Sequence, residues 1–325
     1  MKEAAVRRRG LDVHRLVLVA FIVGLGVVQF FLNPFQRVLV AEIMVWCIFA
    51  LSYDVLLGYT GLMSLGHALF FGVGAYGVIL STLSFGFPVL PALAVAVAVT
   101  AALSVGLGYV AARLTGVYFA IVTLIFGVVF FLTAQNWRWL TGGDDGLSFE
   151  LAPVGISGAK FSLYDPVASY YFILVFLAVS WLLLTRMMNS PVGKALEAIR
   201  ENEDRARLLG YNVQRYKLFA FTAAGVFAGL AGGLHAVLFR FASSQLFFVS
   251  NSINPLVWTL AGGAGTLVGP VVGTIVLMLT LDYLSSLFPY YLIILGIILI
   301  ITIRIAPRGL VGSIIHRWRA TRVSR

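Results

Sequence analysis

Three carboxylates interrupt apolar runs of this 325-residue sequence: Glu42, Asp54 and Asp282. A charge inside a membrane-spanning helix costs about 2.5–3.5 kcal/mol on insertion scales, so each is a candidate for function. Glu42 and Asp282 lie near the ends of their runs, where a side chain can simply reach the interface with water. Asp54 lies four residues before Gly58, about one helical turn from the predicted break in the helix. Its carboxylate is predicted either to cap or hydrogen-bond broken backbone or to contact a ligand.

The segment GYTGLMSLGH, residues 58–67, separates two apolar runs and is too rich in glycine and polar residues for a plain membrane span. Glycine permits bends, and short hydroxyl side chains can bond the backbone groups that a bend frees. We expect Gly58 and Gly61 to allow the bend. Thr60 and Ser64 are then expected to bond the freed backbone, and His67 to begin the next helix. His67 is expected either to fix this loop or to donate to a substrate carboxylate.

A second glycine-rich segment, GGAGTLVGP at residues 262–270, lies in the opposite half of the chain. Paired interruptions in two halves of a membrane protein point to a transport path. Non-helical backbone at membrane depth also needs protein or water around it. The candidate residues of such a path are Asp54, Gly58, Gly61, Ser64, His67, Gly262, Gly263 and Gly265.

Other chemistries find little support in the sequence. The single cysteine, Cys47, and the scattered histidines offer no metal-ligand spacing, so we expect no metal site. Gly193-Lys194 is followed by Ala195 and lacks the upstream glycine of a phosphate-binding loop. GVGAYG at 72–77 lies inside an apolar run without a preceding strand, so it is not read as a dinucleotide site. We predict no catalytic residues, no enzyme activity and no cofactor bound by this chain.

The composition predicts an all-α, polytopic transmembrane bundle that uses residues 1–325 as one domain. The chain is 60% apolar and 11% charged, with a mean hydropathy of +0.97, whereas soluble domains carry roughly 25% charged residues. About 17–25 apolar residues cross a bilayer as a helix. The predicted crossings, eight to ten with interrupted helices among them, are 16–32, 38–57, 67–86, 88–112, 117–134, 167–186, 216–239, 253–267, 268–287 and 290–305. Of these, 117–134 and 253–267 are short and glycine-flanked, so either is alternatively re-entrant.

The distribution of basic residues predicts the orientation. Of 23 Lys and Arg, five lie in 1–15, seven in 186–217 and six in 304–325. Cytoplasmic loops carry an excess of Lys and Arg, so both termini, including the basic leader 1–15 and the tail 306–325, are expected in the cytoplasm. The acidic segment 135–165 is expected on the outer face. This placement of the basic residues argues against a nucleic-acid partner.

Small residues recur at helical spacing in three places. Without a hydrophobic drive between helices in lipid, small residues let backbones approach closely, so helix packing is the expected role. The three stripes are Gly225, Gly229 and Gly233; Gly265, Gly269 and Gly273; and Ser64, Ala68, Gly72 and Ala75.

Residues 189–215 form the largest predicted cytoplasmic loop. Pro191 can begin a helix and Gly210 can end it. The apolar residues of this helix are expected on one face, namely Leu196, Ile199, Ala206 and Leu209. Four acids and four bases lie between 194 and 207. That mixed charge suits docking to a soluble protein better than adsorption to lipid, which favours Lys and Arg.

GKALEAIRENEDRARLLGYNVQRYKLFAF, which contains this helix, resembles the cytoplasmic coupling loop of ABC importer permeases for branched-chain amino acids. LLGYTGLMSLGHALFFGVGAY, TGGDDGL, LAGGAGTLVGPVVG and APRGLVG resemble the same family in the same order, so the resemblance covers most of residues 45–312. SLGHA and the basic leader make the LivM-type subunit the better fit, since the shorter partner permease typically has an NFAHG-like stretch.

The resemblance implies a transport subunit of the bacterial inner membrane, with 135–165 as its periplasmic segment. Such a subunit pairs with a homologous permease, two cytoplasmic ATPase subunits and a periplasmic substrate-binding protein. ATP and Mg²⁺ would bind to the ATPases, and lipid would surround the permease. Coupling to the ATPases would fall on Lys194, Glu197, Ala198, Arg200, Glu201 and Gly210. Related permeases carry other amino acids, urea or short amides, so these substrates stay open. So do an ion-coupled secondary transporter, with Asp54 and His67 as proton relays, and a structural membrane protein.

Overall fold

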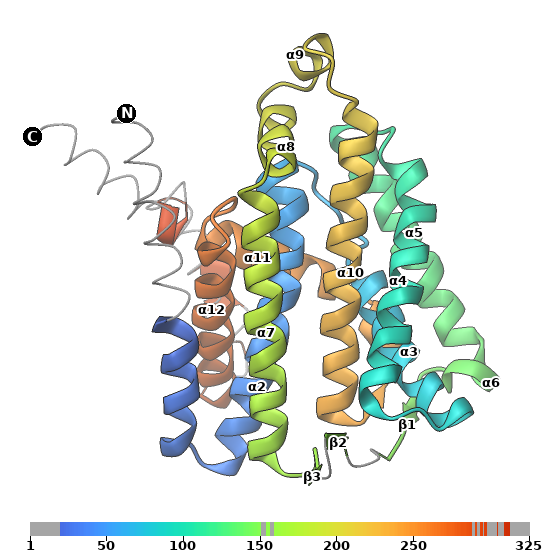
Figure 1. Ribbon diagram of the computed structural model, residues 1–325, viewed down its shortest axis with the longest axis vertical. Helices are drawn as coiled ribbons and strands as arrows, with labels where there is room; N and C mark the ends of the chain where they lie inside the picture. Colours follow the sequence, from blue (N-terminus) through green and yellow to red (C-terminus); the bar gives the residue numbers. More distant parts are fainter. Residues whose placement is uncertain are drawn as a thin grey trace, which may run out of the picture.

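The computed structural model describes residues 20–150, 154–156, 159–287, 290, 293–294, 296–297, 304 and 309–312. Its long helices run side by side, with the short helices α8 and α9 at one end and the strands β1 to β3 at the other (Figure 1). These are called the α9 end and the β1 end. The basic leader 1–15 and most of the tail 306–325 lie outside the described residues.

The helices and strands follow the apolar runs of the sequence. They are η1 Gln29–Phe31, α2 Pro34–Asp54, η2 Val55–Thr60, α3 Ala68–Phe85, α4 Val89–Ala111, α5 Gly116–Asn136, α6 Arg138–Thr141, β1 Leu147–Ser148, β2 Val154–Ile156, β3 Ala159–Phe161, α7 Pro166–Met188, α8 Pro191–Glu201, α9 Glu203–Leu208, α10 Val213–Phe239, β4 Phe241–Ala242, η3 Ser244–Phe247, α11 Ser250–Gly262 and α12 Val268–Leu287. η2 is a π-helix that continues α2. β1 pairs with β4, and β2 with β3, both antiparallel.

Seven helices of the described residues are long and apolar enough to cross a membrane, counting α2 together with η2. The predicted span 117–134 is among them, as α5. The predicted crossing 253–267 is not a span of its own, because α11 has 13 residues and at 1.5 Å per residue is about 20 Å long. The first prediction, 16–32, is described only in part, as the shorter apolar helix Ala20–Phe31. Most of 290–305 lies outside the described residues.

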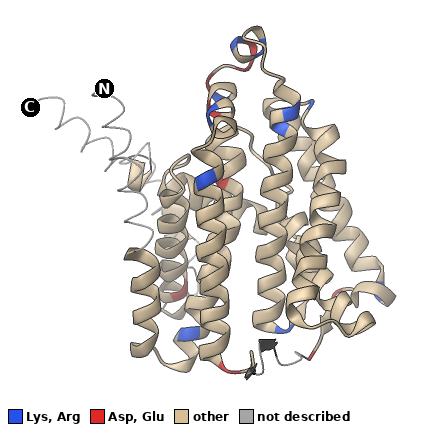
Figure 2. Ribbon diagram, viewed as in Figure 1, with Lys and Arg blue, Asp and Glu red and all other residues tan. Residues whose placement is uncertain are grey.

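The core of the bundle is formed by α2, α3 and α10. Over their most apolar 18 residues, 78%, 61% and 67% respectively are buried, against 28% for α5. α10 packs on α2, α3 and α4, and α2 also packs on α7 and α12. Charged side chains gather toward the two ends of the bundle, with several at the α9 end (Figure 2).

Helix packing depends on glycines, as the stripes predicted. A side chain at Gly229 would overlap Thr100 of α4, and one at Gly225 would overlap Ser104 of the same helix. Gly74 of α3 lies against the Gly229 carbonyl. The packing interpretation of the α10 stripe is therefore confirmed. In the α12 stripe, Gly273 lies directly against the backbone of α11 at Trp258.

Candidate functional site: a junction of two broken helices

The first break lies within residues 58–67, where the sequence predicted it. The π-helix η2 follows α2 directly, and Gly61 ends it with a φ of +73°, a conformation that glycine adopts without strain. The Thr60 hydroxyl donates to the Val55 carbonyl at 2.7 Å, as expected of a side chain that bonds freed backbone. Short π-helical segments within α-helices are frequent at functional sites.

Residues 61–66 then run without regular structure up to the start of α3, with Leu62, Ser64 and Gly66 buried and Gly61 and Met63 exposed. Their backbone is bonded by side chains of other segments: the Tyr53 hydroxyl donates to the Ser64 carbonyl at 2.9 Å, and the Leu65 amide donates to the Thr123 hydroxyl at 3.2 Å. The prediction that the Ser64 hydroxyl bonds freed backbone is wrong. Its hydroxyl is buried without a hydrogen-bond partner among the described residues, and its carbonyl makes the contact instead.

His67 precedes α3, as predicted, and is fully buried. Its Nε2 lies 2.8 Å from the Ser52 hydroxyl, and its ring stacks on Phe49 with centroids 5.1 Å apart. These contacts fit the interpretation of His67 as a residue that fixes the loop. The next amide, that of Ala68, donates to the Ser252 hydroxyl of α11 at 2.8 Å.

The second break joins α11 to α12. Gly263 and Gly265 have φ of +121° and +80°, and Leu267 has a φ of +56° that is uncommon outside glycine. The Asp54 side chain bonds this turn. Its carboxylate accepts hydrogen bonds from the Gly265 amide at 2.7 Å and the Leu267 amide at 3.2 Å. Asp54 thus makes the predicted bonds to broken backbone, but the backbone belongs to the other broken segment.

The two breaks touch, and α8 touches both. A side chain at Gly58 would overlap the Gly265 amide nitrogen and the Asp54 carboxylate. The Arg200 guanidinium donates to the Gly58 carbonyl, and its Nη1 also lies where a side chain at Gly265 would go. We call Asp54, Gly58, Gly265 and Arg200 the junction. It unites three residues predicted for a path with one predicted for coupling.

Other predicted path residues lie outside this contact. Gly262 packs against the backbone at Gly269, and Gly263 lies against Gly309. Gly61 contacts the side chain of Arg200 and so borders the junction.

The comparisons with known proteins bear on this arrangement. Residues 38–303 match the family described as branched-chain amino acid transport system / permease component. The chain belongs to this family.

Curated relatives of this permease agree. It is 31% identical over 319 residues to the high-affinity branched-chain amino acid transport system permease protein LivM of Escherichia coli K12, covering 91% of this chain and 75% of the relative. Identity to LivM of Salmonella typhimurium LT2 is also 31%, over 82% of this chain and 68% of the relative. A probable LivH of Methanocaldococcus jannaschii is 31% identical over 43% of this chain and 46% of its own. No solved structure matches.

The permease is therefore a multi-pass membrane protein, and the resemblance to the LivM-type subunit is confirmed. Among the described residues, no group of three His, Cys, Asp or Glu side chains lies together as metal ligands.

The predicted coupling helix of the permease is two helices. It begins at Pro191 as expected, but Asn202, with a φ of −161°, ends α8, and its side chain caps α9 by accepting from the Arg205 amide at 2.8 Å. Asn is a preferred N-cap residue, which explains the break. Leu196, Ile199 and Ala206 are buried as predicted.

The outward face of the loop differs from the prediction at one position. Leu209 was expected on the buried face but is 71% exposed, because the α8–α9 break turns the end of α9 away from the bundle. Lys194, Glu197, Glu201 and Gly210 are exposed, and Ala198 is half-buried. Of the coupling candidates, only Arg200 reaches the junction.

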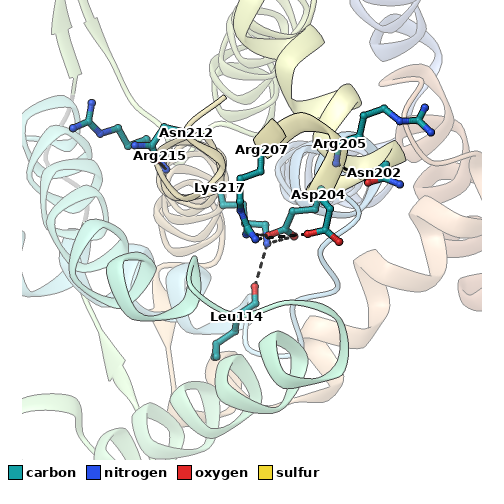
Figure 3. A network of polar contacts seen from close by, with 9 residues as sticks. Leu114, Asn202, Asp204, Arg205, Arg207, Asn212, Arg215 and Lys217 are labelled. Carbon is teal, nitrogen blue, oxygen red and sulfur yellow. Dashed lines mark hydrogen bonds and ion pairs between the residues drawn. The ribbon is translucent and has the colours of Figure 1, made fainter. Parts of the chain in front are cut away.

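A buried ion pair at the α9 end was not predicted from the sequence. Lys217 of α10 is 1% exposed, and its Nζ lies 2.6 Å from Glu203 Oε2 and donates to the Leu114 carbonyl at 3.3 Å (Figure 3). The available signal was a lysine within the predicted span 216–239.

At the β1 end, the TGGDDGL segment is anchored to η3. The Asp144 carboxylate accepts from the Ser244 hydroxyl at 2.7 Å and from the Gln135 amide at 3.0 Å. These hydrogen bonds, first that of Ser244, lower the pKa of the exposed Asp144 carboxyl below its ordinary value. Pairing of β1 with β4 holds the same segment, so it forms an ordered surface at this end.

Proposed function

We propose that this chain is a permease subunit of an ATP-driven ABC importer that moves branched-chain or related amino acids across a bacterial inner membrane. The α9 end would face the cytoplasm and bind two ATPase subunits, which hold ATP and Mg²⁺. A homologous permease would complete the pathway, and a periplasmic substrate-binding protein would bind the β1 end.

The observation that carries this proposal is the contact of Arg200 with Gly58. Arg200 lies on α8, whose neighbouring side chains Lys194 and Glu197 are exposed for a partner, while Gly58 lies in the first broken helix. Because Gly58 also packs on Gly265, a shift of α8 reaches both breaks in a single step. An ATPase that moved α8 would thereby move the interrupted helices, which are the usual sites of substrate passage.

Reconstitution tests the proposal. The complex is purified with its candidate partner permease, two ATPases and binding protein, and is placed in liposomes. ATP is supplied inside the liposomes in one sample and outside them in another. We expect leucine, isoleucine or valine uptake that requires both the binding protein and ATP on the ATPase side. Uptake of urea or short amides instead would change the substrate but keep the mechanism. Uptake by the chain alone under a proton gradient would contradict the proposal and favour an ion-coupled transporter.

A further inference from the structure

A second connection runs from the α9 end to the first broken segment, and it begins at a buried charge. The Lys217 side chain is 2% exposed and that of Glu203 is 23% exposed, and their 2.6 Å contact is the buried ion pair of this end. Removing one partner of such a pair leaves an uncompensated charge, so each holds the other strongly in place. Glu203 begins α9, and therefore the position of α9 is tied to the start of α10.

Lys217 also holds the turn that leads into α5. Its ammonium donates to the carbonyl of Leu114, which lies between α4 and α5, as the dashed line in Figure 3 marks. Only 28% of the most apolar stretch of α5 is buried. Near its start the buried Phe119 packs on Phe221 of α10, so the Leu114 turn and Phe119 together fix where this helix begins.

α5 in turn contacts the irregular segment 61–66. The Thr123 hydroxyl of α5 accepts from the Leu65 amide at 3.2 Å. Gly66 lies directly on the Thr123 carbonyl, and Gly127 lies against Gly66, so neither position has room for a side chain without displacement. A movement of α5 must therefore displace the backbone at 65 and 66.

We infer that the Lys217–Glu203 ion pair is a second coupling link, which transmits movement of α9 through the Leu114 turn and α5 to residues 65–66. It is separate from the Arg200–Gly58 contact, which starts from α8 and meets η2, the helix that directly precedes residues 61–66. The Arg200 side chain also lies beside Gly61, so one link meets the start of the irregular segment and the other meets its end at residues 65–66. The inference rests on the proposed function, since it takes α9 to be moved by an ATPase.

The closing experiment measures amino-acid uptake per ATP hydrolysed in the reconstituted complex. The principal variant is the double substitution Lys217→Met with Glu203→Gln, which removes both charges and so avoids an unpaired buried charge. Lys217→Met alone and Lys217→Arg are measured beside it. Arg207→Gln is the matched control, because Arg207 contacts the same Glu203 carboxylate at 2.9 Å but is 63% exposed.

We expect the double variant to assemble normally and to lose about tenfold in uptake per ATP, with Lys217→Arg recovering part of the loss and Arg207→Gln unchanged. A second readout separates coupling from stability: labelling of Met63→Cys, whose residue is 41% exposed in the irregular segment, in a Cys47→Ser background. In the wild type the labelling rate should differ between nucleotide-free and ATP-trapped states, and in the double variant this difference should vanish.

The possible outcomes distinguish failure of the second link from failure of the proposed function. A folded double variant with wild-type uptake per ATP and wild-type labelling would overturn the second link while leaving the proposed function intact. Absence of ATP-driven uptake by the wild-type complex would overturn both.

Discussion

Asp54 and Gly265 are 211 positions apart in the chain, yet the Asp54 carboxylate accepts a hydrogen bond from the Gly265 amide at 2.7 Å. The same carboxylate accepts from Leu267, so one side chain satisfies two amides of a turn that has no regular structure. Buried backbone donors need such partners, and the α11–α12 turn depends on Asp54 for them.

Substituting Asp54 should therefore destabilise the permease. Asp54→Ala leaves the partly buried Gly265 amide and the buried Leu267 amide unpaired, at about 1–3 kcal/mol for a buried donor, whereas Asp54→Asn keeps one acceptor oxygen and should cost about half as much. Thermal unfolding of the purified protein in detergent measures the difference. Ser180→Ala is the control, because the buried Ser180 hydroxyl has no partner among the described residues. Equal unfolding temperatures for Asp54→Ala and Ser180→Ala would contradict the assignment.

Gly58 should not tolerate a side chain. In Gly58→Ala the new methyl group overlaps the Gly265 amide and the Asp54 carboxylate, and overpacking of this kind typically costs about 1–3 kcal/mol. Gly106→Ala is the matched control, since nothing lies within 4 Å of the position its methyl group would take. The two unfolding temperatures are compared in the same detergent. A stable Gly58→Ala would mean that the two broken helices do not approach as closely as described.

Arg200→Ala should separate transport from stability. A single partly buried hydrogen bond contributes about 0.5–1.5 kcal/mol, so folding should be little affected. We expect ATP-driven uptake to fall about tenfold, because α8 loses its contact with the Gly58 carbonyl. Arg205→Ala, at an exposed arginine of α9, serves as control and should retain uptake. Normal uptake with Arg200→Ala would remove the junction from the coupling path.

Glu197→Lys should abolish stimulated ATPase activity while leaving membrane insertion intact. Glu197 is exposed on α8, so the reversal of charge acts on a partner and not on the bundle. ATPase activity of the reconstituted complex is measured with and without substrate-loaded binding protein. Gln214→Lys adds a positive charge at another exposed position of this end and is expected to leave stimulation unchanged. Normal stimulation in Glu197→Lys would remove the coupling claim for this face.

Acid should release the TGGDDGL segment. The pKa of Asp144 is lowered by the Ser244 hydroxyl and then by the Gln135 amide, so its contribution to stability is complete above the unfolded pKa of about 3.9. It is lost as the pH falls through the lower, folded pKa. The difference in unfolding temperature between wild type and Asp144→Asn should therefore be present at pH 6 and shrink below about pH 4. A difference that is constant from pH 6 to pH 3 would contradict this.

Local sequence determined much of this permease. Apolar runs long enough to span a bilayer become the seven long helices, because a backbone without water must bond within its own segment. Gly61 supplies the positive φ that ends η2, and Pro191 begins α8. Leu196, Ile199 and Ala206 share the buried face that helical periodicity assigned to them.

Tertiary structure alone decided the rest. No local pattern says that Asp54 bonds Gly265, that Lys217 pairs with Glu203, or that Arg200 of the loop contacts the first break. Asn202 also divided a helix that periodicity alone would continue, which turned Leu209 outward. Periodicity reports only which face of a helix is buried. Which buried groups meet is settled by how the helices pack, since every buried donor and charge must find its partner in another segment.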